Sequence, residues 1–417
     1  MSYQPNSSLN TYNKACHVYL DIDITNNNIG TDTSPVPVNF TDVRSTAYLS
    51  KASDYFLSVV RWSIGSNLPI AVPQIQLPQT ALNQNTTVYS FTMVYHTVMD
   101  SVDTPSSPIQ EFLQFTPQNT YLQYPTAYPQ NPPDILSNQY FYCDSVAHVV
   151  DMINITLNSC FNQLALLNPM ALSQSPYFVY DEDTGKLTYY GASDFISPTP
   201  ITPMVNGHYV QVYMNGSMNN WLNSLPSFNT GYKAPSGKNY LINFKQLPSQ
   251  QNILASPVIG VDGATYYYYS LTQEYSSIPA MSPITSLVFT SSLIPIEPTN
   301  VSAPIIYGAN NILPVNSGVS GGLLPDSNNA NLASILTDFE VPLVIGNEYR
   351  SILYYNPTAE FRLFDLISNC PLQKISINVF WKDKIGNLHP MTLNSGQSAT
   401  MKILMRKKEF NNIEPSL

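Results

Sequence analysis

The feature that most constrains this chain is a strict two-residue alternation near its C-terminal end. Two runs show it, one at 374–381 and one at 399–406. The side chains of a β-strand point alternately to opposite faces, so each run predicts a strand with one buried and one wetter face. Asp383-Lys384-Ile385-Gly386 supplies a turn after the first run. We therefore predict two long strands that help to close a β-sandwich.

Strand-like segments gather at both ends of the chain. Eight of them have β-branched and aromatic residues or alternation, namely 17–25, 38–49, 54–64, 86–98, 284–296, 349–366, 372–382 and 399–407. Neither end alone has enough strands to bury its apolar faces, so we expect the strands near 17–98 to pair with those near 284–407. Eight strands in two sheets are typical of a jelly roll. The sequence thus predicts an all-β fold, a single jelly-roll β-sandwich.

A long central block interrupts this pattern and predicts a large mixed α/β insertion. Apolar residues at helical spacing predict one long helix at about 145–167, with Asp144 or Ser145 as its N-cap. The expected domain organisation, in chain order, is a flexible N-terminal arm at 1–16, the first half of the jelly roll at 17–100, the insertion at 101–279, the second half at 280–408 and a tail at 409–417.

The alternation also predicts which residues fill the sandwich. On the expected buried faces, the candidate core residues are Leu57, Val59, Ile375, Ile377, Val379 and Trp381. Apolar side chains at every second position of a strand indicate packing against a facing sheet. No catalytic role is needed to explain these segments.

The composition favours a protein that is packed against neighbours. Charged residues make up 11% of the chain, against about 25% in an average soluble protein. The chain has 29 tyrosines and 34 prolines. Interface cores disfavour charge and favour tyrosine, so this surface suits assembly better than a free enzyme.

The net charge of −10 argues against nucleic-acid binding by the chain as a whole. A basic group at the final strand is the exception, formed by Lys402, Arg406, Lys407 and Lys408. Three interpretations stay open for it: a solvated strand end, protection of a sheet edge against stray pairing, or a surface that faces a packaged genome.

No pattern in the sequence indicates enzyme chemistry, a metal or a cofactor. The four cysteines and five histidines have no metal-ligand spacing. Gly318-Val319-Ser320-Gly321-Gly322 matches a nucleophile elbow in form, but it lies in a loop without the required strand and helix. The N-terminal residues do not resemble a secretory signal, and no run of eighteen apolar residues predicts a membrane span.

Several segments resemble a known family. They are ILYYNPTAEFRLFDL at 352–366, PLQKISINVFWKDKIGNLHPMTLNSG at 371–396, KILMRKK at 402–408, SDYFLSVVRWSIGSNLPIAVPQI at 53–75 and NTTVYSFTMVY at 85–95. Together they resemble the penton, or vertex, minor capsid protein of Polinton-like viruses, virophages and adintovirus-like elements. They lie toward both ends of the chain and cover about a fifth of it.

The resemblance implies a virion structural protein located in an icosahedral capsid. It further implies a homopentamer at the fivefold vertices that contacts the major capsid protein, with weak contact to packaged DNA as a further expectation. Two alternatives stay open, a major capsid subunit and a carbohydrate-binding β-sandwich of a surface protein. A metal-dependent jelly-roll enzyme is disfavoured, because such an enzyme needs a histidine and glutamate cluster that this sequence lacks.

Overall fold

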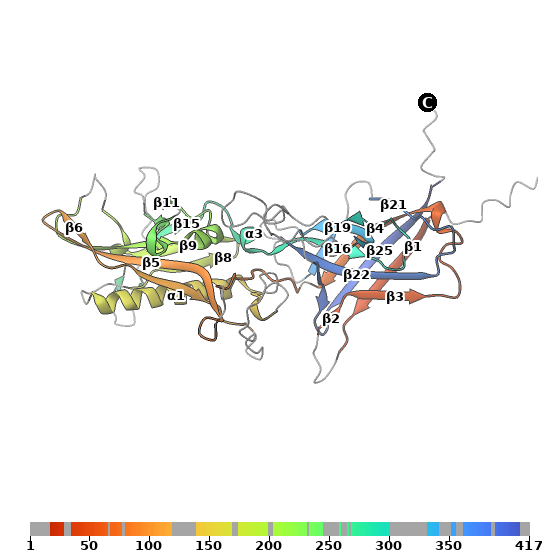
Figure 1. The fold of residues 1–417 in the computed structure, drawn as a ribbon, viewed down its shortest axis with the longest axis horizontal. Coiled ribbons are helices and arrows are strands. Elements are labelled where there is room, and N and C mark those ends of the chain that lie inside the picture. The colour runs from red at the N-terminus through yellow and green to blue at the C-terminus, as the bar shows by residue number, and fades with distance from the viewer. Residues whose placement is uncertain are drawn as a thin grey trace, which may run out of the picture. The chain divides into compact units, whose positions relative to one another are not determined.

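The structure is a computed structural model that describes most of the chain between residues 17 and 408. The described ranges are 17–28, 35–65, 67–76, 80–118, 139–168, 174–198, 203–231, 233–244, 258–259, 265–266, 268–297, 299–300, 332–341, 352–355, 362–384 and 388–408. The predicted arm at 1–16 and tail at 409–417 lie outside them, as does the 318–322 motif. The chain divides into two compact units (Figure 1). The first comprises Met1–Leu68, Ile284–Pro342 and Tyr349–Leu417, and the second Pro69–Pro283 and Leu343–Glu348.

The first unit contains two antiparallel sheets. One has the order β1 (His17–Thr25), β25 (Ser398–Lys407), β4 (Tyr55–Gly65) and β20 (Ile352–Tyr355), and β21 (Phe364–Asp365) also pairs with β4. The other has the order β19 (Ile335–Glu340), β16 (Ile284–Thr290), β22 (Lys374–Asp383) and β23 (Leu388–Pro390), and β3 (Asn39–Val43) also pairs with β22. Two-stranded ladders join β2 (Val36–Pro37) to β24 (Thr392–Leu393) and β17 (Thr299–Asn300) to β18 (Leu332–Ala333). The prediction of a jelly-roll β-sandwich built from both ends of the chain is confirmed.

The core of the first unit lies between the inner faces of these sheets. The predicted core residues Leu57, Val59, Ile375, Ile377, Val379 and Trp381 are all buried, with exposures of 0–5%. A ring cluster links the two sheets, since Trp62 on β4 lies 5.8 Å from Phe289 on β16 and 5.9 Å from Phe339 on β19 between ring centroids. Aromatic contacts at these separations add to the stabilisation from burial.

The second unit combines a central sheet, a smaller sheet and helices. The six-stranded sheet has the order β11 (Ser227–Asn229), β12 (Tyr240–Ile242), β10 (Gly207–Met214), β5 (Thr86–Met99) and β6 (Val102–Pro105), and β7 (Ile109–Gln114) also pairs with β5. A three-stranded sheet has the order β15 (Tyr268–Thr272), β9 (Lys186–Ala192) and β8 (Tyr177–Asp181), and β13 (Val258–Ile259) pairs with β14 (Thr265–Tyr266). The short helices are α2 (Gly216–Trp221) and α3 (Ile278–Met281).

The long helix predicted at 145–167 is α1 (Val146–Leu167). Ser145 is its N-cap in extended backbone, although its side chain makes no capping hydrogen bond. Buried residues recur along one face, among them Val149, Ile153 and Leu157, and this face packs on β5, β7 and β8. The apolar spacing in the sequence therefore reflects packing of the helix on two sheets.

The structure corrects the predicted boundary between jelly roll and insertion. The segment 86–98 was expected in the sandwich, but β5 is the central strand of the second unit, which begins at Pro69 rather than at residue 101. Most of its residues are buried because α1 packs on it and neighbouring strands flank it. Alternation predicts that a strand forms but not which sheet it joins. The segment 349–366 likewise contains two short strands, β20 and β21, instead of one.

Candidate assembly surface

The outer face of the β1–β25–β4–β20 sheet exposes apolar side chains. Even-numbered residues of β1, such as Leu20 and Ile22, are buried, so the odd-numbered residues point outward. Tyr19 on β1 is 58% exposed, and Ile352 and Tyr354 on β20 are 53% and 56% exposed. We call these three residues the outer apolar set. Tyrosine and isoleucine exposed on a strand face are typical of surfaces that become buried in an assembly.

Charged residues on the same face form ion pairs with one another within the chain. Asp21 on β1 lies 3.3 Å from the Lys402 ammonium on β25 and 3.8 Å from the Arg61 guanidinium on β4. The ladders place these residues side by side, since Asp21 pairs with Lys402 and Lys402 with Arg61. The Lys402 ammonium also lies 5.7 Å from the ring centroid of Tyr19. Asp21 therefore offsets part of the positive charge of Lys402 and Arg61 on this face.

The rest of the predicted basic group lies at the end of β25. Lys408 forms an ion pair of 2.6 Å with Asp365 on β21, and its ammonium lies 5.2 Å from the Phe56 ring centroid. Arg406 and Lys407 stand opposite Phe56 and Tyr55 of β4. The Arg406 Nε is buried without a hydrogen-bond partner. Lys402 and Lys408 are thus paired with carboxylates of their own unit.

A buried polar pair lies inside the first unit next to the predicted core residue Trp381. His389 Nε2 is 2.8 Å from Asp383 Oδ2, and the Asp383 side chain has 0% exposure. The Trp381 ring stacks on the His389 ring with centroids 4.0 Å apart. The pair links neighbouring strands β22 and β23, because Trp381 stands opposite His389 in their register. These contacts make the His389–Asp383 pair a structural part of the core.

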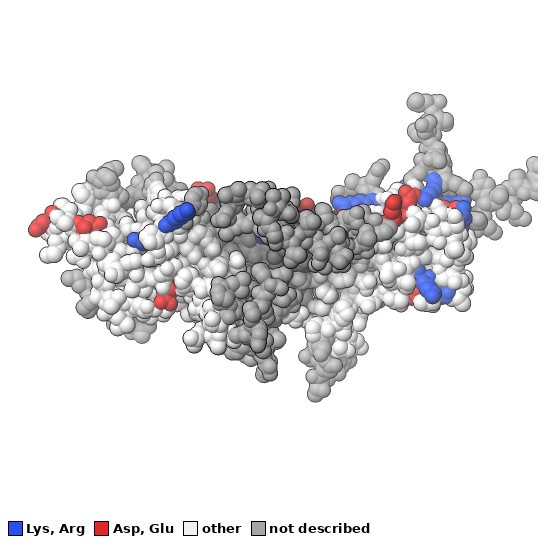
Figure 2. All heavy atoms as spheres, viewed as in Figure 1, with Lys and Arg blue, Asp and Glu red and all other residues white. Residues whose placement is uncertain are grey.

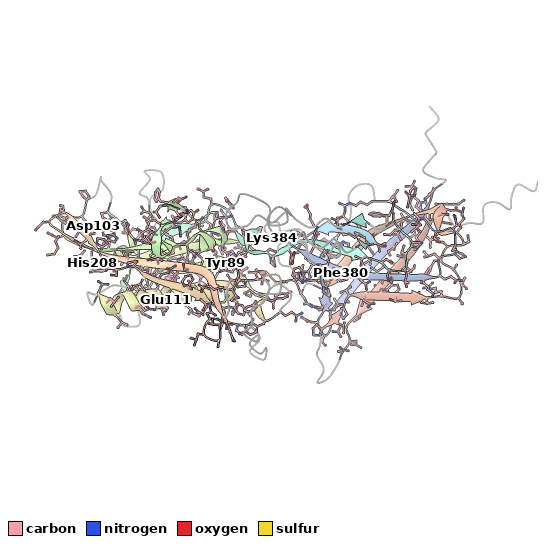
Figure 3. The ribbon with its side chains drawn as sticks, viewed as in Figure 1. Tyr89, Asp103, Glu111, His208, Phe380 and Lys384 are labelled. Atoms are coloured by element: carbon pink, nitrogen blue, oxygen red, sulfur yellow. The ribbon has the colours of Figure 1, made fainter. Side chains whose placement is uncertain are left out.

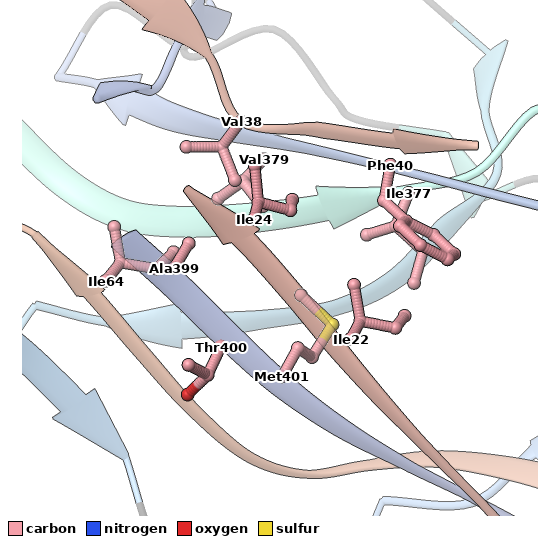
Figure 4. A pocket seen from close by; sticks show the side chains of 10 residues that line it. All are labelled: Ile22, Ile24, Val38, Phe40, Ile64, Ile377, Val379, Ala399, Thr400 and Met401. Carbon is pink, nitrogen blue, oxygen red and sulfur yellow. The ribbon is translucent and has the colours of Figure 1, made fainter. Parts of the chain in front are cut away.

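The hollow between the two sheets is too small for a ligand. Its lining is almost wholly apolar and consists of Ile22, Ile24, Val38, Phe40, Ile64, Ile377, Val379, Ala399, Thr400 and Met401 (Figure 4). The free space is about 10 Å³, roughly what one water molecule needs. Across the described ranges, no group of three or more His, Cys, Asp and Glu could hold a metal ion. In the same residues, no helix is long and apolar enough to cross a membrane.

Sequence reasoning did not single out the outer apolar set. The signal for Tyr19 was available, since it stands among Asp21, Asp23 and Thr25 on the polar side of an alternating strand. Ile352 and Tyr354 had no such signal, because the length and register of β20 could not be read from the segment 349–366. Charged side chains are sparse on the face of the molecule that Figure 2 shows, as the composition predicts.

Comparison with known proteins identifies a family for nearly the whole described chain. The family model described as Sputnik minor capsid protein V18/19 matches residues 18–407. Structural protein V19 of Sputnik virophage is 24% identical over 238 residues, which are 56% of this chain and 95% of V19. Uncharacterized protein V18 of the same virophage is 34% identical over 116 residues, which are 27% of this chain and 64% of V18.

Two solved structures resemble this chain over almost its full length. A chain of the Sputnik virophage particle, solved by cryo-electron microscopy at 3.5 Å, is 25% identical with a TM-score of 0.73, and the match covers 96% of this chain and all of that one. The mavirus penton protein is 15% identical with a TM-score of 0.56, covering 94% of this chain and 99% of that one. The second match shows a shared fold.

Proposed function

Because the chain belongs to the Sputnik minor capsid protein V18/19 family and is a virion structural protein of the capsid, we propose that it forms the penton capsomer. Five copies would close each fivefold vertex of an icosahedral shell and contact the major capsid protein. Family membership also confirms the resemblance seen in the sequence. A pentameric ring needs one pair of complementary patches repeated around an axis.

The observation that carries this proposal is the outer face of the β1–β25–β4–β20 sheet. It combines the outer apolar set with charges that are already paired inside the chain. Burying such a face against another subunit removes apolar area from water, and the ion pairs of Asp21 with Lys402 and Arg61 offset part of the cost of desolvating these charges. We therefore expect this face to form subunit contacts whose strength depends weakly on salt.

The test is the oligomeric state of the purified full-length chain by sedimentation velocity. We expect pentamers, and we expect Tyr19→Asp with Tyr354→Asp to shift the chain to monomers by replacing two apolar rings of the contact with carboxylates. Tyr275→Asp is the matched control, because Tyr275 is 54% exposed in the second unit and lies outside the proposed contact. A dimer or trimer as the sole stable species, or a monomer at every concentration, would contradict the proposal.

The alternatives drawn from the sequence gain less support. A double jelly roll would need a second sandwich, and the second unit instead combines sheets with a long helix. No observation favours carbohydrate binding. We also propose that the protein is not an enzyme, in keeping with its structural family and with the lack of a metal-binding cluster in the described residues.

Contact between the basic strand end and packaged DNA is a further, weaker proposal. The ion pairs of Lys402 and Lys408 reduce the charge that this group offers to phosphate. Protection of a sheet edge does not apply to β25, because β1 and β4 pair with its two sides, so the basic group fits stabilisation of the sheet at least as well as contact with DNA. Imaging of the particle tests it: residue 408 on the inner surface of the shell supports contact with DNA, and residue 408 on the outer surface contradicts it.

A further inference from the structure

The second unit ends in a hairpin whose tip exposes apolar side chains. Strands β5 and β6 form the hairpin (Figure 1). Met99 stands directly opposite Val102, which puts both side chains on one face. Met99 is 69% exposed and Val102 is 65% exposed. The neighbouring loop adds Val205, which is 56% exposed. We call Met99–Asp103 together with residues 203–206 the hairpin tip.

Two backbone N–H groups of the β5–β6 turn donate hydrogen bonds to the loop at 203–206. The Ser101 N–H donates to the Val205 carbonyl at 2.9 Å, and the Asp100 N–H donates to Asn206 Oδ1 at 2.9 Å. The turn and the loop therefore form one surface, although they are about a hundred residues apart in the sequence. A surface that is already ordered loses less entropy when a partner binds.

A polar cluster holds β6 at its base. The Asp103 carboxylate lies 3.0 Å from His96 Nδ1 and accepts a hydrogen bond of 2.8 Å from the Tyr209 hydroxyl. The His96 and Tyr209 rings stack with centroids 4.5 Å apart. Figure 3 shows Asp103 at this end of the unit. These contacts tie a four-residue, fully exposed edge strand to β5 and β10, so the tip is held rigidly.

The turn between β5 and β6 has a backbone conformation that residues other than glycine seldom adopt. Asp100 and Ser101 have φ values of 49° and 66°, the left-handed region at both turn positions. Asn-Gly and Asp-Gly are the preferred pairs for such a two-residue hairpin turn, so Asp100 is tolerated in this region and Ser101, which stands where glycine is preferred, is the strained residue. Folding alone does not account for Asp-Ser here. The choice retains a carboxylate at the outermost point of the hairpin, and strained residues gather where a protein binds something.

We propose that the hairpin tip is a docking site for a different protein, whose surface has an apolar depression with lysine or arginine at its rim. Neither 96–109 nor 203–211 contains a lysine or arginine, so Asp100 and Asp103 give the tip an acidic character. A basic rim complements these carboxylates, and an apolar depression accepts Met99 and Val102. The tip of a second copy would bring like charges together, and an anionic lipid surface would repel them.

This inference goes beyond the proposed function, and cross-linking from the tip tests it. A benzophenone amino acid is placed at Val102 in the full-length chain and, as a control, at Leu82, which is 98% exposed in the same unit. Each chain is irradiated in a lysate of the cells that produce the protein, and the cross-linked peptides are identified by mass spectrometry. We expect Val102 alone to label one protein, at an apolar peptide flanked by lysine or arginine.

Binding of that purified protein to the full-length chain completes the test. We expect Met99→Ser with Val102→Ser to raise Kd by more than about tenfold, and Asp100→Lys by about tenfold, while Leu82→Ser leaves it unchanged. The proposal is overturned if Val102 labels proteins no better than Leu82, if it labels only another copy of this chain or lipid, or if the serine variants bind normally. Pentamer formation is measured separately, so its failure would not be confused with these outcomes.

Discussion

The two units build their interiors from different side chains. Of the tyrosines buried in the described residues, Tyr55 lies in the first unit, whereas the second unit has Tyr89, Tyr95, Tyr140, Tyr189, Tyr209 and Tyr268. The first unit is filled mainly by aliphatic residues at alternate strand positions, with one buried His–Asp pair. The first interior therefore depends on apolar packing, and the second also depends on keeping buried hydroxyl groups neutral.

Replacing a buried tryptophan should have the largest effect on the stability of each unit and should distinguish the two. Trp381 in the first unit and Trp221 in the second are 3% and 5% exposed, and each stacks on a neighbouring ring. Replacement by alanine should cost about 3–5 kcal/mol in each case, since each leaves a cavity. Calorimetry should show two unfolding transitions. Trp381→Ala should lower the midpoint temperature of one, and Trp221→Ala should lower the midpoint temperature of the other. Equal shifts of a single transition would mean that the units unfold together.

The next effect compares a fully buried His–Asp pair of the first unit with a more exposed one of the second. The Asp383 side chain has 0% exposure beside His389, whereas Asp103 is 45% exposed beside His96. Asp383→Ala leaves a buried histidine without its partner and should cost about 3 kcal/mol. Asp103→Ala should cost only about 1–2 kcal/mol, because water can replace the lost hydrogen bonds. Denaturation in urea measures both, and a larger loss for Asp103→Ala would contradict this ranking.

The last effect concerns alkaline pH and falls mainly on the second unit. Burial raises the pKa of Tyr89 to about 12, and burial also raises the pKa of Tyr189. A phenol with a raised pKa in the folded state stabilises fully below its unfolded pKa of about 10, and this contribution is lost as pH rises toward the folded value.

For Tyr89 the loss should reach about 2–3 kcal/mol between about pH 10 and pH 12. Calorimetry at pH 8 and pH 11 should therefore show a larger decrease for the transition of the second unit than for that of the first. Tyr89→Phe is the control, because it removes the titrating group and should reduce the difference. An equal decrease in the midpoint temperatures of both transitions would contradict the distinction between the two interiors.

The sequence predicted elements well where a local pattern determines them. The alternation gave β1, β22 and β25 nearly in full, and helical spacing gave α1. The sheet that contains β5 depends on contacts with α1 and β10, which no local pattern specifies. Strands β6 and β7 were missed because the Asp100-Ser101 turn has no glycine and many prolines follow it. The pairing of Lys402 with Asp21 depends on the register of β1 and β25, which only the structure provides.

The position of β25 has a consequence for protein synthesis. This strand ends at Lys407 and lies between β1 and β4. Strands β1 and β4 therefore cannot be joined in one sheet until β25 has been synthesised. At about 5–20 residues per second, 417 residues take roughly 20–80 s to make. Nearly all of the second unit leaves the ribosome earlier and can fold first. A chain that ends before Ser398 would contain the second unit but would lack the strand between β1 and β4 in the first unit.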